Sequence, residues 1–167
     1  MHNTPIAYFI TFTTFGTWLH GDPRKSVIHR QGFSEQIDPN AAFYRYEQVQ
    51  LKHPPVTLDS HQRKIVQDVI VRHCNLRQWR LFALHVRTNH IHIVVQADRT
   101  IDQVMKELKS WATRLLRQNG LCVPVVWTSG GSCNYIFKSS KLLEKVHYVI
   151  HEQGTPMEYY LDESIRF

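Results

Sequence analysis

Two strand-like segments separated by a few polar residues constrain the fold of this chain most strongly. Residues 79–86 and 91–96 are rich in aliphatic, aromatic and β-branched side chains, and Arg87, Thr88 and Asn89 lie between them. Such compositions favour strands, and a connection this short pairs two strands as a tight antiparallel hairpin. We therefore expect a sheet that contains this hairpin.

The flanking segments predict the remaining architecture. Residues 7–14 favour a strand, and shorter strand-like pieces lie at 123–127 and 133–137. Apolar residues at helical spacing predict helices over 58–74, 100–118 and 139–152. The order strand, helix, strand, strand, helix, strand and helix is typical of an α+β sandwich. We expect a central antiparallel sheet with its helices packed on one face.

Length and composition indicate one globular domain spanning residues 1–167. The chain has 167 residues, of which 43% are hydrophobic and 20% charged, so it can bury one core. From about residue 20 to 55 no clear period is visible and prolines recur, which predicts a long loop. The net charge of +6 and the pI of about 9.4 suit a protein that meets phosphate backbones.

Cysteines and apolar runs exclude several other classes. Cys74, Cys122 and Cys133 are odd in number and contain no CxxC pair, so neither a disulfide framework nor a cysteine-rich zinc site is indicated. No signal peptide is visible, and no apolar run approaches the roughly 18 residues of a membrane span. The expected location is the cytoplasm.

His90 and His92 form the first motif whose side chains could bind a metal ion. Alternate side chains of a strand share a face, so the two imidazoles lie side by side and can ligate one divalent cation. A chance pair in a chain with eleven histidines remains the alternative. A histidine-triad hydrolase would need a third histidine where Val94 stands, and a cupin-like site would need a carboxylate within residues 93–97.

The last predicted helix contains Tyr148. Its apolar face consists of Leu142, Leu143, Val146, Val149 and Ile150. Tyr148 falls roughly opposite that face, and Glu152 follows one turn later on the same side. The alternative to a functional role for Tyr148 is an ordinary surface tyrosine. Gln153 would project near the apolar side. A phenol beside a metal and a carboxylate can attack a phosphodiester.

In combination these motifs resemble the HUH single-tyrosine transposases, which include small insertion-sequence enzymes and REP-associated tyrosine transposases. The resemblance runs through almost the whole chain in five stretches, namely residues 15–22, 88–92, 108–114, 127–132 and 148–154. It implies a ferredoxin-like fold and a metal-dependent enzyme that nicks and transfers single-stranded DNA. Tyr148 would form a 5′-phosphotyrosine, and His90 and His92 would hold magnesium or manganese.

The third metal ligand is where the chain departs from the family pattern. The family usually has an amide about one turn after the tyrosine, whereas Glu152 occupies that position here and the amide, Gln153, follows it. Helix geometry and the preference of hard cations for carboxylates favour Glu152, with Gln153 as the alternative.

The resemblance also implies a partner, single-stranded DNA folded into imperfect hairpins. Four cations of the 100–118 helix and two tryptophans are candidate DNA contacts: Lys106, Lys109, Arg114, Arg117, Trp18 and Trp127. A solvated helix face and tryptophans that belong partly to the core are the alternatives. A non-catalytic hairpin-binding protein and a hydrolase that uses metal-bound water are the competing functions. Relatives act as monomers or as homodimers, and both remain open.

Overall fold

A computed structural model describes residues 4–23, 26–30 and 33–166. Its main sheet is antiparallel and has the strand order β6-β1-β5-β4-β7. The strands are β1 (Ala7–Thr13), β4 (Arg80–Val86), β5 (His90–Gln96), β6 (Ser132–Ile136) and β7 (Glu158–Leu161). The larger helices are α2 (Ser60–Leu76), α3 (Ile101–Gln118) and α4 (Ser139–His151). No helix in the described ranges combines the length and the apolar character that crossing a membrane would require.

The element order β1-α2-β4-β5-α3-β6 is the ferredoxin-like arrangement, so the predicted α+β class with a central antiparallel sheet is confirmed. The hairpin of β4 and β5 pairs Val86 with Ile91 next to its turn. The sequence did not predict β7, which follows the tyrosine helix and pairs with the outer side of β4. In contrast, residues 123–127, all of which the structure describes, form no strand. They contribute a single β-bridge, between Trp127 and Thr14.

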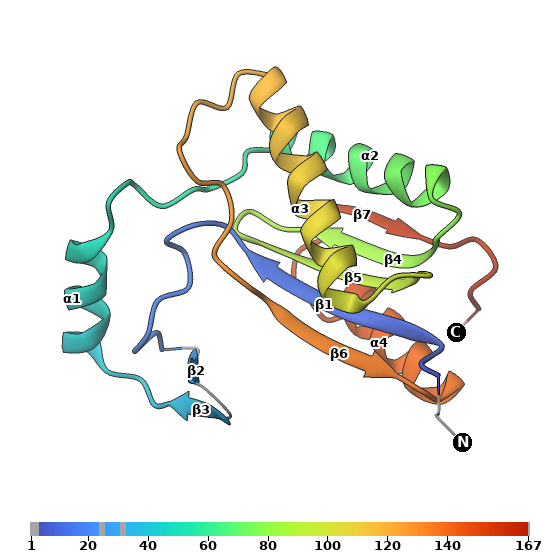
Figure 1. Cartoon of the computed structure of the whole chain (residues 1–167), viewed down its shortest axis with the longest axis horizontal. Coiled ribbons are helices and arrows are strands. Elements are labelled where there is room, and N and C mark those ends of the chain that lie inside the picture. Colours follow the sequence, from blue (N-terminus) through green and yellow to red (C-terminus); the bar gives the residue numbers. More distant parts are fainter. Residues whose placement is uncertain (1–3, 24–25, 31–32, 167) are drawn as a thin grey trace.

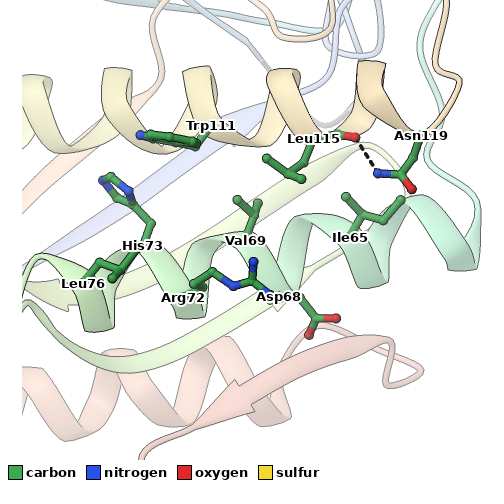
Figure 2. A pocket seen from close by; sticks show the side chains of 9 residues that line it. All are labelled: Ile65, Asp68, Val69, Arg72, His73, Leu76, Trp111, Leu115 and Asn119. Carbon is green, nitrogen blue, oxygen red and sulfur yellow. Dashed lines mark hydrogen bonds between the residues drawn. The ribbon is translucent and has the colours of Figure 1, made fainter.

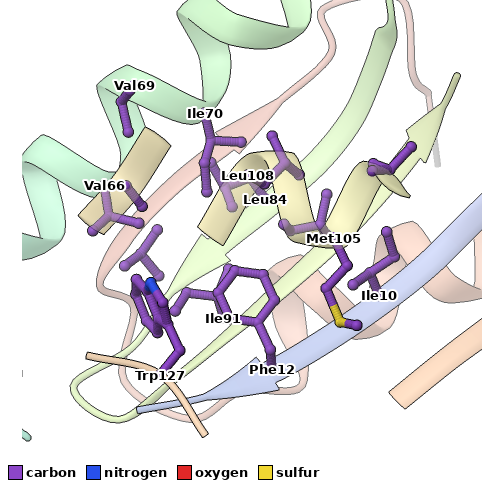
Figure 3. Close-up of a cluster of buried hydrophobic side chains, with 14 of the residues drawn as sticks. Ile10, Phe12, Val66, Val69, Ile70, Leu84, Ile91, Met105, Leu108 and Trp127 are labelled. Atoms are coloured by element: carbon purple, nitrogen blue, oxygen red, sulfur yellow. The ribbon is translucent and has the colours of Figure 1, made fainter. Parts of the chain in front are cut away.

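The prediction that all helices pack on one face of the sheet is wrong for α4. Helices α2 and α3 cover one face, and α4 covers the other (Figure 1). The reason is the two-residue alternation of the strands, because both faces of the central strands are apolar and each needs a cover. Figure 3 shows Ile10, Phe12 and Ile91 on the α2–α3 side, whereas Phe9 and Val94 pack towards α4.

The segment predicted as a long loop contains regular structure. It holds the strand pair β2 (Ser26–Arg30) and β3 (Phe33–Ile37), followed by the helix α1 (Ala41–Gln50). None of the described side chains of α1 is buried, so its sequence has no apolar stripe from which a helix could be recognised. Its one local signal is Asn40, which caps the helix by accepting hydrogen bonds from the amides of residues 42 and 43.

Candidate active site between the sheet and helix α4

The histidine pair lies on the face of the sheet that α4 covers. His90 and His92 alternate on β5 with Ile91 and Ile93, which face the opposite core. The two imidazole centroids are 4.8 Å apart. His92 Nδ1 is 2.8 Å from the hydroxyl oxygen of Thr11 on β1. The strand therefore presents two neighbouring rings, as the sequence predicts.

Tyr148 meets this pair from α4. Its ring centroid is 5.6 Å from that of His92, and Phe9 packs edge-to-face against the tyrosine at 5.9 Å while stacking on His92 at 5.9 Å. Tyr148 is consequently half-buried against the sheet, not directed away from the apolar face. Leu143, predicted on the apolar face, is 42% exposed instead. The face of α4 that packs on the sheet is rotated about the helix axis, relative to the predicted apolar face, towards Tyr148.

The electrostatics of the pair suit a metal ligand. Burial, and after it the charge of the neighbouring His90, lowers the pKa of His92 from 6.5 to about 3. His92 is therefore a neutral ring at physiological pH, with a nitrogen lone pair available for coordination. His90 Nδ1 is 2.7 Å from Oδ1 of Asn89. An N–H at this Nδ1 can donate to the amide oxygen, which leaves Nε2 as the lone-pair nitrogen.

Acidification is expected to destabilise the metal-free protein through His92. Its folded pKa lies below its unfolded value of 6.5, so the unfolded chain binds more protons and stability is lost as the pH falls below 6.5. Between about pH 7 and about pH 5 the free energy of unfolding should decrease by about 2 kcal/mol. Urea denaturation with a chelator present measures this change. The decrease should shrink in His92→Asn and persist in His61→Asn, an exposed control; equal decreases in all three proteins would refute the assignment to His92.

The two candidates for the third ligand occupy different environments. Glu152 is at the surface, with 55% of its side chain exposed, and its carboxylate is 3.1 Å from Nδ1 of His147. Gln153 is half-buried and donates from its amide nitrogen to the carbonyl of Tyr148 at 3.0 Å, and its side chain is close enough to His92 to act on the pKa of that ring. The helix ends at His151 and the backbone leaves helical geometry at Glu152. The helical projection that favours Glu152 therefore fails at this point.

His85 is a buried residue of this region that sequence reasoning missed. It is fully buried on β4, and its Nδ1 is 2.8 Å from the carbonyl oxygen of Val149 in α4. The amide of Met157 donates to its Nε2 at 3.2 Å, so Nδ1 carries the proton and donates to Val149. His85 thus ties the end of the tyrosine helix, and the chain that follows it, to the sheet. A polar residue within the apolar 79–86 segment was the available signal.

The predicted DNA contacts do not gather at this site. Lys109 is directed into the fold, donates to the carbonyls of Thr128 and Gly130, and has its pKa lowered to about 8 by burial. Trp127 is 7% exposed and belongs to the core (Figure 3). Both side chains make contacts within the fold because the 127–131 loop packs on α3, and their contact with DNA remains a prediction. All the α3 candidates lie on the helix that covers the face opposite α4.

The other candidates are closer to solvent. Lys106 and Trp18 are exposed. The Arg114 guanidinium lies 5.2 Å from the ring centroid of Trp111, and Arg117 donates to the carbonyl of Pro124 at 2.9 Å. The structure places none of these four beside Tyr148, and their contact with DNA remains a prediction.

A pocket between α2 and α3 lies on the other side of the sheet from this site. Figure 2 shows that His73, Trp111 and Leu115 point into it, with Arg72 and Asp68 at its rim. His73 Nε2 is 3.0 Å from the carboxylate of Glu107. The pocket contains none of the residues around the histidine pair, so it is separate from the candidate active site.

Comparison with known proteins gives a consistent picture. The family model described as "Transposase IS200 like" matches residues 51–153, which is more than half of the chain and includes both histidines, Tyr148 and Gln153. A solved structure of a REP-associated tyrosine transposase bound to a REP hairpin is similar, with a TM-score of 0.55 and 12% identity over 91% of this chain and 69% of that one. At this identity the similarity shows the fold. No curated protein sequence matches the chain.

Proposed function

Because this chain belongs to the IS200-like transposase family, we propose that it cuts and rejoins single-stranded DNA with Tyr148 as the nucleophile. The observation that supports this most directly is the contact between Tyr148 and His92, whose ring centroids are 5.6 Å apart. The two side chains come from different elements, a helix and a strand, and the packing of α4 brings them together. A hydroxyl nucleophile beside candidate metal ligands is the arrangement that phosphoryl transfer requires.

We propose that His90, His92 and Gln153 hold a divalent cation, magnesium or manganese. The fit rests on three observations: both Nδ1 atoms have hydrogen-bond partners, His92 is neutral, and the Gln153 amide nitrogen is used by the Tyr148 carbonyl. Because that nitrogen donates to the Tyr148 carbonyl, the amide oxygen of Gln153 is the atom that would ligate the cation, and oxygen suits a hard cation. When bound, the ion would neutralise charge on the phosphate and polarise it towards attack.

The residues of the chain perform the rest of the reaction. The Tyr148 oxygen attacks the scissile phosphorus, its O–P bond forms, and the bond to the 3′ oxygen breaks. The phenol loses its proton, and the departing 3′ oxygen takes one up as a free hydroxyl. The product is a 5′-phosphotyrosine, which the 3′-hydroxyl of a second strand can attack to reseal the DNA and release Tyr148. Packing against Phe9 holds the tyrosine ring in place for both steps.

The proposed substrate is single-stranded DNA that folds into a hairpin. The solved structure with the same fold has a REP hairpin bound, and this chain has a net charge of +6, which favours binding to phosphates. Palindromic repeats next to the gene would supply natural candidates.

A labelled hairpin from the DNA flanking the gene, incubated with the protein and manganese and run on a denaturing gel, tests the proposal. We expect a labelled species that migrates with the protein, requires the metal and is destroyed by protease. Cleavage without such an adduct would favour hydrolysis by metal-bound water. Tight binding without cleavage, across hairpins from both flanks, would instead favour a non-catalytic hairpin-binding protein.

A further inference from the structure

Lys145 is directed towards the nucleophile from one turn earlier in α4. Its Nζ lies 5.3 Å from the ring centroid of Phe9 and 5.7 Å from that of Tyr148. Residues three apart share a helix face, so Lys145 lies on the side of α4 that meets the sheet, and it is half-buried there. Its charge thus lies near the tyrosine ring.

This lysine makes no ion pair with the described residues, although its charge, after the hydrogen bond from Lys141, helps to lower the pKa of the Glu144 carboxyl. Lys141, one turn earlier, is 2.6 Å from the carboxylate of Glu144, and both of these side chains are largely exposed. Within the described residues no carboxylate lies at ion-pair distance from Lys145. Aromatic faces attract a cation only weakly. A partly buried lysine side chain that makes no ion pair can stabilise a bound anion.

The strand β6 beside Lys145 presents polar side chains that could contact the same anion. Phe9, under the lysine, stacks on His92 and pairs in register with Asn134 of β6, and Thr11 pairs with Ser132. Ser132 and Asn134 share the face of Ile136, which packs towards α4. Both are exposed and hydrogen-bonded to each other at 3.1 Å. An exposed strip of hydroxyl and amide groups therefore extends from the histidine pair to the edge of the sheet.

We propose that Lys145 is a catalytic residue that contacts the scissile phosphate, and that Ser132 and Asn134 contact the adjoining backbone of the strand to be cut. This inference rests on the proposed function, since it names a further group of the same site. An ammonium at this position stabilises the negative charge of the phosphate as the Tyr148 oxygen approaches and the 3′ oxygen departs. Backbone hydroxyl and amide contacts position a strand without reading its sequence.

The test compares Lys145→Met with Lys141→Met, a matched loss of one charge from the same helix, and with Lys145→Arg. Single-turnover adduct formation at saturating hairpin should slow by about 10- to 100-fold in Lys145→Met and by less than about twofold in Lys141→Met. Lys145→Arg should restore the rate to within about fivefold of the original protein. Melting temperatures of all three variants show whether the fold is intact.

A second measurement does not depend on cleavage. With a chelator present, the slope of hairpin affinity against salt concentration should fall by about 0.7 in Lys145→Met, the loss of one contact to a single strand. An unchanged slope overturns the inference even if the chain forms no adduct, whereas a reduced slope without any adduct contradicts only the proposed function. A slow Lys145→Met that Lys145→Arg fails to rescue would mean that the lysine acts through packing alone, which also overturns the inference.

Discussion

Replacing Tyr148 by phenylalanine is expected to abolish the protein–DNA adduct and to reduce strand cleavage by about 10⁴-fold or more. Phenylalanine keeps the ring that packs against Phe9 and His92, so the variant should fold and should bind the hairpin with nearly unchanged affinity. It lacks only the oxygen that forms the bond to phosphorus. The measurement is single-turnover cleavage of a labelled hairpin, with binding followed separately by gel shift.

Tyr159→Phe is the matched control. Tyr159 is an exposed residue of β7 with the same side chain, and its loss of a hydroxyl should leave both cleavage and the adduct intact. Cleavage that survives in Tyr148→Phe would contradict the tyrosine mechanism and would assign the attack to water. Loss of hairpin binding together with cleavage would show that the hydroxyl acts in recognition.

Replacing His92 by alanine is expected to weaken manganese binding by more than about 100-fold and to eliminate detectable cleavage. His92 occupies the centre of the site, with contacts to Thr11, Phe9, His90 and Tyr148. Its removal deletes one proposed ligand and the ring on which the others pack. Isothermal titration with manganese alone measures the affinity without any DNA. The exposed His61→Ala on α2 serves as the control and should bind the ion normally.

The same titration separates the two candidates for the third ligand. Gln153→Ala should lower manganese affinity by about 10- to 100-fold, because its half-buried side chain is close enough to His92 to act on the pKa of that ring. Glu152→Ala should change it by less than about twofold, since that carboxylate lies at the surface beside His147. The reverse order of effects would show that the end of α4 rearranges when the ion binds, and would restore Glu152 as the ligand.

Local patterns in the sequence were sufficient for the elements with strong periodicity. The hairpin of β4 and β5 follows from two apolar segments and a short polar connection, and α2 and α3 follow from apolar stripes with side-chain caps at Asp59 and Thr100. The strand period alone places His90 and His92 on one face. These features depend on neighbours within a few residues, so no knowledge of the tertiary structure is needed. Helix α1 shows the limit, because a helix that buries nothing has no periodic signal.

Contacts between distant elements had to be seen in the tertiary structure. Packing between segments far apart in the chain decides three features of the site. It sets the side of the sheet that α4 covers, the rotation of α4 that brings Tyr148 and Lys145 inward, and the anchoring of α4 by His85. The choice between Glu152 and Gln153 depends on the residue at which α4 ends, and a one-residue difference there turns a side chain by about 100°. The sequence by itself thus determined the chemical groups of this site and the strand that presents the histidines. The tertiary structure decided which groups meet, because packing and the helix terminus set their directions.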